Sequence, residues 1–306
     1  MYNFTIIIPH KDIPQLLQRC LNTIPQRDDI QIVIVDDNSH LTNEEFASFP
    51  GLERLNTEVI FTKEGRGAGF ARNVGLKYAK GKWLIFADAD DFFVDNFSDL
   101  LDKYLSDEAD VIYFKPTSVQ FLTGGRESER VKSYQNLFSY NNLFLRYAYI
   151  TPWGKFVKRE YVERGHFQFS EVRWGNDSFF MTQVGTSTQS VKIVADILYV
   201  VDERDGSLTR EKVVTDEEFE CRVKQDILAY NYAEGVGFSP FEDILLGRCQ
   251  TLIDKHRWHL LCRVFHSIPN SAYSKIRRRL LHQISLKGSV LLHTLYLVAP
   301  LTKRIR

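Results

Sequence analysis

The chain has 306 residues, of which 44% are hydrophobic and 25% are charged, with 39 basic and 39 acidic side chains. These values are ordinary for a globular protein of one large domain or two small ones, and they exclude an extended or low-complexity chain. The zero net charge hides an asymmetry, because residues 255–306 hold eleven Lys or Arg and no Asp or Glu. The preceding residues therefore carry −11, and a split of this size predicts that the C-terminal segment meets an anionic surface.

Three features predict a protein of the cytoplasm. The opening residues, MYNFTIIIPHKD, lack the pattern of a secretion signal. No uncharged apolar run reaches the roughly 20 residues that a membrane-spanning helix needs. The cysteines are scattered without a CxxC pair, which predicts reduced thiols and neither disulfides nor a zinc site. They are Cys20, Cys221, Cys249 and Cys262.

The first hundred residues alternate between predicted strands and predicted helices. A strand followed by a loop is expected at 4–12, further strands at 30–39 and 82–91, and helices at 13–24 and 69–79. Pro9 is expected to end the first strand, because proline lacks the N–H that a sheet needs. Strands that alternate with helices predict a parallel sheet covered on both faces.

The later residues have less regular patterns. A helix is expected at 96–105, a strand at 110–122, a turn at 124–130 and helical structure at 134–149. The segment TPWGKFVKREYV (151–162) opens a compact region, and VRWGNDSFFMTQV (172–184) is predicted to be a loop that enters a helix. Residues 191–210 predict two strands and a loop, and from residue 216 onward the pattern is helical.

Acidic side chains follow two of the predicted parallel strands. Asp36 and Asp37 end the strand at 30–39, and LIFADADDFF places Asp88, Asp90 and Asp91 after the strand at 82–91. In open α/β sheets, ligands bind at the carboxyl ends of the strands. A helix cap would explain one aspartate but not three, and like charges this close repel unless a cation or hydrogen bonds accept them. The triplet therefore predicts a divalent cation with a diphosphate, since hard cations prefer carboxylate and phosphate oxygens.

The second acidic pair has two interpretations. Asp36 and Asp37 could accept hydrogen bonds from a nucleobase or a ribose, or they could be solvated acids of a turn. Their place beside the first cluster favours the ligand.

No glycine-rich loop for phosphate is present. The first strand is followed by PHKDIPQ, which lacks GxGxxG, and the glycines of GRGAGFARN (65–73) miss that spacing. The P-loop pattern GxxxxGK[ST] does not occur. A phosphate site without a glycine cradle must rely on a metal and basic side chains. Arg72, which opens the predicted helix after Gly69, is placed for that task.

The motifs TIIIPHKD, IVIVDDNS, GAGFARNVGLKYAKGKWLIFADADD and PWGKFVKREYV resemble, in order and spacing, those of inverting family 2 glycosyltransferases. The resemblance spans roughly residues 3–210. It implies the α/β GT-A fold, a Rossmann-like, mostly parallel sheet flanked by helices. The implied domain at 1–210 has a nucleotide-binding half at 1–100 and an acceptor half at 101–210. Residues 211–306 would follow as a helical, basic C-terminal extension.

The resemblance assigns roles in the nucleotide-binding half. Pro9 and Asp37 would line the uridine pocket, and Arg72 would lie near the nucleotide. Asp88 and Asp90 would form the DxD pair, with Asp88 toward the ribose and Asp90 on a divalent metal, Mn²⁺ or Mg²⁺. Within the motifs, Asp91 has no assigned role, and His10 would line the pocket at most.

In the acceptor half, the resemblance assigns the catalytic base to Asp177 of VRWGNDSFF. The base takes the proton of the acceptor hydroxyl as that hydroxyl attacks the sugar. Family members often carry Glu-Asp here, whereas this chain has Asn176 before Asp177. A plain helix cap is the alternative role for Asp177, and Glu171 is the reserve candidate for the base.

Three further positions follow from the resemblance. Trp153 would border the sugar or the acceptor, with a core tryptophan as the alternative. The stretch YVVDERDGSLTR resembles the loop that closes over the diphosphate, where Arg204 would be a diphosphate contact. Asp202 stands where arginine is frequent in the family, which departs from the pattern.

The sequence as a whole predicts a metal-dependent, inverting glycosyltransferase. It would move a sugar from a nucleotide-sugar donor, a UDP-sugar in the first place, to a hydroxyl of a glycan or lipid-linked glycan. Bacterial surface polysaccharide or lipopolysaccharide synthesis is the setting that the resemblance implies. Two rivals are a non-catalytic relative that binds a nucleotide-sugar or glycan, which the departures at Asn176 and Asp202 keep open, and a nucleic-acid-binding protein that uses the basic tail. A sugar nucleotidyltransferase would need a loop rich in glycine and arginine after the first strand, which PHKDIPQ lacks.

The basic tail is expected to hold the protein on the inner face of the cytoplasmic membrane. Apolar side chains gather on one side of a predicted helix, and residues 288–302 are uncharged, which suits an anionic interface. These side chains are Ile276, Leu280, Leu281 and Ile284. The alternative is a helix pair packed on the catalytic domain with a solvated basic face. No nucleic acid is expected, because the aromatic residues of the tail do not interleave with its arginines.

Overall fold

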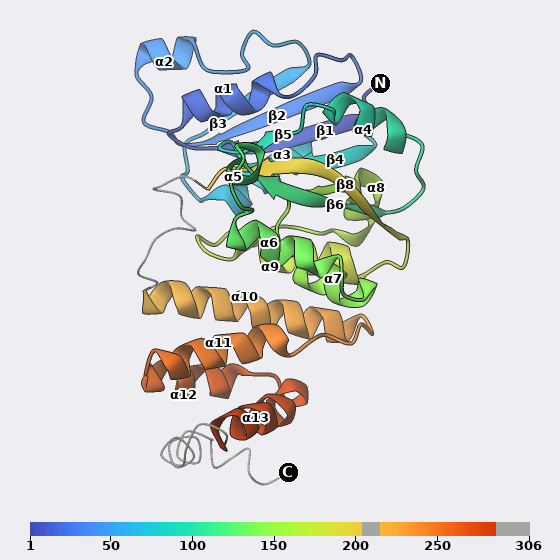
Figure 1. The fold of residues 1–306 in the computed structure, drawn as a ribbon. Helices are drawn as coiled ribbons and strands as arrows, with labels where there is room; N and C mark the ends of the chain where they lie inside the picture. The colour runs from blue at the N-terminus through green and yellow to red at the C-terminus, as the bar shows by residue number, and fades with distance from the viewer. Residues whose placement is uncertain (204–214, 286–306) are drawn as a thin grey trace. The chain divides into compact units, whose positions relative to one another are not determined.

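The computed structural model describes residues 1–203 and 215–285, and the chain divides into two compact units, residues 1–212 and 213–306. In the described part of the first unit, eight strands form one sheet flanked by helices (Figure 1). The strands are β1 (Phe4–His10), β2 (Ile30–Asp37), β3 (Thr57–Thr62), β4 (Trp83–Phe86), β5 (Phe92–Phe93), β6 (Val111–Ser118), β7 (Lys155–Lys158) and β8 (Val191–Val201). The helices are α1 (Pro14–Asn22), α2 (Asn43–Ala47), α3 (Ala68–Tyr78), α4 (Phe97–Tyr104), α5 (Val119–Leu122), α6 (Glu129–Leu137), α7 (Asn142–Ala148), α8 (Arg159–Gly165) and α9 (Asn176–Thr186).

The strand order is β3-β2-β1-β4-β7-β6-β8-β5. Strands β3, β2, β1 and β4 pair in parallel, and β7 then pairs antiparallel with both β4 and β6. Every residue of β2 and β4 is buried, as expected for strands covered on both faces. The predicted α/β fold with a mostly parallel sheet is confirmed.

Pro9 does not end β1, contrary to the prediction. The strand continues to His10, and both residues stay paired with β2, opposite Val35 and Asp36. The pairing of β1 with β4 stops earlier, at Ile7 opposite Phe86. Proline is therefore tolerated inside a central strand, because the neighbour on that side has already ended and no ladder bond is lost.

Other differences from the predicted elements also have local causes. The strand predicted at 82–91 ends at Phe86, and the Asp91 N–H donates to the Asp88 carbonyl in a turn. Residues 134–149 form parts of two helices, because the Asn141 side chain caps a new helix, α7. Residues 191–201 form one long strand, β8, where two were predicted. The sequence reading missed β3, whose side chains are all only half-buried.

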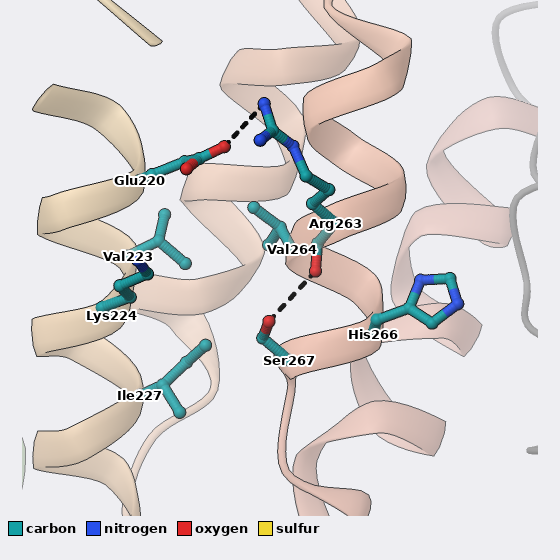
Figure 2. A pocket seen from close by; sticks show the side chains of 8 residues that line it. All are labelled: Glu220, Val223, Lys224, Ile227, Arg263, Val264, His266 and Ser267. Carbon is teal, nitrogen blue, oxygen red and sulfur yellow. Dashed lines mark hydrogen bonds and ion pairs between the residues drawn. The ribbon is translucent and has the colours of Figure 1, made fainter. Parts of the chain in front are cut away.

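The second unit contains four helices within its described residues: α10 (Asp216–Gly235), α11 (Asp243–Asp254), α12 (Trp258–Ser267) and α13 (Asn270–Ser285). They enclose a core that includes Phe219, Cys249, Leu260 and Phe265. A groove of about 400 Å³ lies between α10 and α12, and the pair Glu220–Arg263 lies at it (Figure 2). None of the predicted site residues lines this groove.

The face of α13 that was predicted to meet a membrane is partly occupied by the unit's own core. Ile276 and Leu280 are fully buried there, so these two side chains are not available to lipid. Several basic residues of the tail pair with acids of α10 and α11 or of the loop before α11, which neutralises part of their charge. These pairs are Arg257–Asp216, Arg263–Glu220, Lys275–Glu242 and Arg279–Asp243.

The remaining part of the membrane prediction concerns residues 288–302, which lie outside the described residues. Within residues 1–203 and 215–285, no helix is both long enough and apolar enough to cross a membrane.

Candidate active site

The strand order brings the two acidic clusters to one edge of the sheet. Because β1 lies between β2 and β4, the carboxyl ends of these strands place Asp37, Pro9 and Asp88 along the same edge. Asp37 is nearly fully buried, whereas Asp88 and Asp90 remain half-buried. The predicted parallel sheet implied that these residues lie at one edge, and the strand order places them there.

Asp37 holds the loop that precedes α3. One carboxylate oxygen accepts the Arg66 N–H at 3.0 Å, and the other accepts the Gly67 N–H at 2.7 Å. Gly67 has φ +91°, a conformation that residues with a side chain rarely adopt. Asp37 therefore shapes the entrance of α3. Its predicted place in a uridine pocket stays a prediction.

His10 and Asp36 form a buried pair beside this loop. The His10 Nε2 accepts the Ile13 N–H at 3.2 Å, so the Nδ1 carries the proton and donates to Asp36 at 2.7 Å. Asp36 also accepts from the Ser39 N–H and from the Ser39 hydroxyl. Burial raises the pKa of Asp36, but the hydrogen bonds from His10 and Ser39 outweigh it and the pKa is lowered. Both side chains thus link the ends of β1 and β2.

Helix α3 packs closely against the segment that leads into α9. A Cβ on Gly69 would lie 2.2 Å from the Ser170 carbonyl oxygen and 3.0 Å from the Cβ of Asn176, so glycine is required for this approach. The Asn73 side chain both donates to the Phe169 carbonyl and accepts the Phe169 N–H, at 2.9 and 2.8 Å. The motif GAGFARN therefore brings the start of α9 to the carboxyl edge of the sheet.

Arg72 joins the two groups of candidate residues. The residue is 4% exposed, and its guanidinium donates to Asp88 at 2.6 Å, to Asp177 at 2.7 Å and to Asn176 at 3.0 Å. Burial lowers the pKa of Arg72, yet the carboxylates of Asp177 and Asp88 outweigh it and the pKa is raised. Arg72 is thus a permanent cation that links the DxD sequence to the candidate base.

Asp177 lies in the first turn of α9 and faces this cation. Burial raises the pKa of Asp177, Arg72 opposes the rise, and Asp88 adds to it, so that the pKa lies above the ordinary aspartate value. The side chain is still 31% exposed, so the carboxylate stands in the wall of an open site. A raised pKa brings a general base closer to neutral pH.

Glu171, the reserve candidate, has other partners. Its carboxylate accepts from the Arg66 guanidinium and from the Asn73 side chain, at 3.2 Å in the second case. It therefore helps to hold the loop before α3 against the segment that leads into α9. The assignment of the base to Asp177, with Glu171 in reserve, stays a prediction.

The turn with the acidic triplet is fixed by β8. The Asp88 N–H donates to the Tyr199 hydroxyl at 2.7 Å, and the Asp202 N–H donates to the Asp91 carboxylate at 2.8 Å. Burial, with the charges of Asp88 and Asp90, raises the pKa of Asp91 well above its ordinary value. Asp91 is therefore a buried anchor of the turn, whereas Asp88 and Asp90 are half-buried.

Trp153 is 1% exposed and stacks on Tyr199, with ring centroids 5.6 Å apart. Lys155 stabilises the segment that precedes Trp153. Its ammonium donates to the Thr151 carbonyl at 2.6 Å and lies 3.4 Å from the centroid of the Tyr149 ring. Trp153 thus packs behind the acidic turn through Tyr199. Its predicted contact with a sugar or acceptor stays a prediction.

The donor set of this site fits a cation that a substrate helps to hold. Among the described residues, no group of three or more His, Cys, Asp or Glu side chains could hold a metal ion by itself. Asp88 shares its charge with Arg72, and Asp91 is buried, so the turn offers one or two carboxylates. Mg²⁺ is typically bound in this way, with substrate phosphates and water as its other ligands.

Three side chains near the site were not predicted from the sequence. Arg19 of α1 donates to the Asp90 carbonyl, Tyr199 accepts from Asp88, and the charge of Arg130 on α6 opposes the raised pKa of Asp91 and Asp177. One signal was present in the sequence. Asp202 is an acid where arginine is frequent in the family, which could have indicated that another basic side chain supplies the positive charge near the turn. The predicted diphosphate contact Arg204 lies outside the described residues.

Comparison with known proteins identifies a family. The family model described as glycosyl transferase family 2 matches residues 5–165. The glycosyltransferase EpsJ of Bacillus subtilis is 25% identical over 87% of this chain and 79% of its own length. The poly(ribitol-phosphate) beta-N-acetylglucosaminyltransferase TarS of Staphylococcus aureus is 22% identical over 72% of this chain, which spans 39% of that relative.

Solved structures share the fold. The crystal structure of S. aureus TarS 1–349 in complex with UDP-GlcNAc superimposes with a TM-score of 0.65 and 18% identity, over 88% of this chain and 82% of that one. A mannosyltransferase of Pyrobaculum calidifontis in complex with GDP-Man and Mn²⁺ gives a TM-score of 0.55 and 17% identity, over 99% and 83% of the two chains. At these identities the likeness shows the GT-A fold.

Proposed function

The chain belongs to glycosyl transferase family 2 and is a glycosyltransferase, and from that premise we propose that it transfers a sugar from a UDP-sugar with inversion, in a divalent-metal-dependent reaction. The observation that carries the proposal is the contact of one buried arginine, Arg72, with both Asp88 and Asp177. The DxD sequence and the candidate base therefore belong to one site. The acceptor is a hydroxyl of a cell-surface glycan or of a lipid-linked glycan.

The donor would lie along the carboxyl ends of β2, β1 and β4. Pro9 and Asp37 border the nucleoside, and Asp88 faces the ribose. Asp90 would hold Mn²⁺ or Mg²⁺ together with the diphosphate, since Mg²⁺ is typically bound by one or two carboxylates and substrate phosphates. When bound, the cation stabilises negative charge on the leaving diphosphate as a Lewis acid. TarS binds UDP and UDP-GlcNAc, and the Pyrobaculum enzyme binds Mn²⁺, which supports this choice of donor and cation.

Asp177 would take the proton of the acceptor hydroxyl. The carboxylate lies in the first turn of α9, within hydrogen-bond distance of Arg72, and this contact fixes its orientation. Asn176 occupies a position where a second acid is frequent in the family, and its carbonyl oxygen also accepts from Arg72. Arg72 therefore contacts two carboxylates and one neutral amide, and Asp177 is the only acid within α9 that could serve as the base.

The test of this function is the release of UDP from a panel of UDP-sugars in the presence of Mn²⁺. Water can replace the acceptor hydroxyl in this assay. We expect slow release from at least one donor, loss of that release with EDTA, and an anomeric configuration opposite to that of the donor in the first sugar product. GDP-sugars serve as the comparison. Consumption of no UDP-sugar, or consumption that EDTA leaves unchanged, would contradict the proposal and favour a relative that only binds.

We also propose that the C-terminal segment holds the enzyme at an anionic membrane surface. The support is the charge of residues 255–306, reduced by the ion pairs within the second unit. Electrostatic binding of this kind weakens with salt. Co-sedimentation with phosphatidylglycerol vesicles at low salt is the expected result, and its absence would leave packing within the protein as the role of this segment.

A further inference from the structure

Arg19 of α1 lies beside the acidic turn and contacts the turn, the strand that follows it and the residue after β8. One guanidinium nitrogen donates to the Asp202 carboxylate at 2.6 Å, and another donates to the main-chain carbonyl of Asp90. The guanidinium also lies over the Phe92 ring, 5.0 Å from its centroid. These contacts connect α1, the acidic turn and the residue that follows β8, positions more than 70 residues apart in the sequence.

Asp202 completes the arrangement from the other side. Its carboxylate receives Arg19, and its own N–H donates to the buried Asp91 at 2.8 Å. The Arg19 side chain is 37% exposed and that of Asp202 is 18% exposed, so the geometry of the pair depends on the several contacts that each residue makes. A planar guanidinium can bind a carboxylate and a carbonyl at once, which the point charge of a lysine does less well.

The acidic turn therefore has a cation on each of two sides. Arg72 binds the Asp88 side chain, whereas Arg19 binds the backbone of Asp90 and leaves the Asp90 carboxylate to other partners. A carbonyl fixed by a charged donor restrains the peptide on either side of it, and with it the direction of the attached side chain. The contact thus acts on the orientation of Asp90 without neutralising it directly.

We propose that Arg19 and Asp202 are positioning residues that form a clamp on the acidic turn and set the direction in which Asp90 presents its carboxylate to the cation. This inference rests on the proposed role of Asp90 as the metal-binding residue. The chain thus uses an arginine of its first helix, paired with an acid after its last strand, to prepare the site.

Two readouts test the clamp in the full-length protein. The first is amide hydrogen exchange of residues 88–93 and Asp202 without ligand, and the second is the Mn²⁺ dissociation constant in the presence of UDP, from the electron paramagnetic resonance of free Mn²⁺. For Arg19→Ala we expect faster exchange at Asp91 and Asp202 and a roughly 10-fold weaker binding of Mn²⁺, the range typical of residues that orient metal ligands. Arg19→Lys and Asp202→Asn should each give an intermediate loss.

Arg159→Ala is the matched control. Arg159 also donates to a main-chain carbonyl, that of Gly81, and to a carboxylate, that of Glu163, and it is 33% exposed. Its contacts are at the start of β4, away from the acidic turn, so exchange in the turn and the Mn²⁺ affinity should not change.

The outcomes separate the clamp from the proposed function. Unchanged exchange of the turn in Arg19→Ala overturns the clamp. Faster exchange with an unchanged Mn²⁺ dissociation constant overturns its role toward the cation. If the wild type itself binds no Mn²⁺ with UDP, the metal-dependent function fails, and with it the role of the clamp toward a cation, while the exchange measurement still decides whether Arg19 holds the turn.

Discussion

Asp177→Asn is expected to lower the rate of sugar transfer by about 10²–10⁴-fold while UDP binding is retained. Asparagine keeps the oxygen that accepts from Arg72 and has nearly the same shape, so the contact with the Asp88 side of the site can persist. It cannot take a proton from an acceptor hydroxyl. The measurement is the initial rate of UDP release at saturating donor and acceptor, with UDP affinity measured on the same sample.

Two other acids serve as comparisons. Asp226 of α10 is also a buried carboxylate, bound to Arg248 at 2.7 Å, and burial raises its pKa as well. Asp226→Asn should lower the stability of the second unit without changing the rate of transfer per folded molecule. Glu171→Gln should reduce the rate less than Asp177→Asn. A transfer rate in Asp177→Asn within a few-fold of the wild type would contradict the role of Asp177, and a larger loss in Glu171→Gln would assign the base to that residue.

Arg72→Met is expected to destabilise the first unit by about 3 kcal/mol, the lower end of the cost of removing one partner from a buried ion pair, because the two carboxylates left behind are half-buried. Asp88 and Asp177 would face each other without the cation between them. The direct measurement is the free energy of unfolding of the first unit by urea, with the second unit followed separately.

The same variant has a defined pH dependence. Without Arg72, the pKa of Asp177, already raised by burial, rises further, because Arg72 opposes that rise. A carboxyl whose pKa is higher in the folded than in the unfolded state loses its contribution to stability as pH rises through the folded pKa. The deficit of Arg72→Met should therefore be smaller at pH 5 than at pH 8. Any residual transfer should reach its plateau at higher pH than in the wild type, since the base works only when deprotonated.

Arg146→Met is the control for this pH effect. Arg146 is as buried as Arg72, at 3% exposure, and donates to the carbonyls of Gly185 and Thr188 and to the side chain of Gln189. Its replacement should cost stability by an amount that changes little between pH 5 and pH 8. A deficit in Arg72→Met that is equally independent of pH would show that the charges of Asp88 and Asp177 are not what Arg72 holds together.

Much of the fold follows from local patterns in the sequence. Continuous apolar runs that end in acids predicted β2 and β4, and their alternation with helices predicted the parallel sheet. Local patterns failed where a neighbour decides the outcome. Pro9 stays in β1 because β4 has ended beside it, and β3 has no buried side chain that would mark it as a strand. The face of Ile276 and Leu280 on α13 has the pattern expected for a membrane surface but packs in the core of its own unit.

Only those residues of the candidate site that belong to recognisable motifs could be predicted from the sequence. Asp88, Asp90 and Asp177 stand out by residue type and position, but the link between Asp88 and Asp177 through Arg72 depends on the close approach of α3 to α9 at Gly69. Arg19 lies 71 residues from Asp90 and 183 from Asp202, so no pattern along the chain could indicate these contacts. The stacking of Trp153 on Tyr199 likewise depends on the three-dimensional fold and could not be predicted from the sequence.

The measurement that tests the central claim most directly is UDP binding by calorimetry, with and without Mn²⁺, on the wild type and on Asp90→Asn. The expected result is that the wild type binds UDP only with Mn²⁺, that Asp90→Asn loses this dependence, and that the exposed neighbour variant Asp95→Asn behaves as the wild type. UDP binding that ignores both Mn²⁺ and the change at Asp90 would contradict the account. In that case the acids of LIFADADDFF would not hold a cation and a diphosphate together.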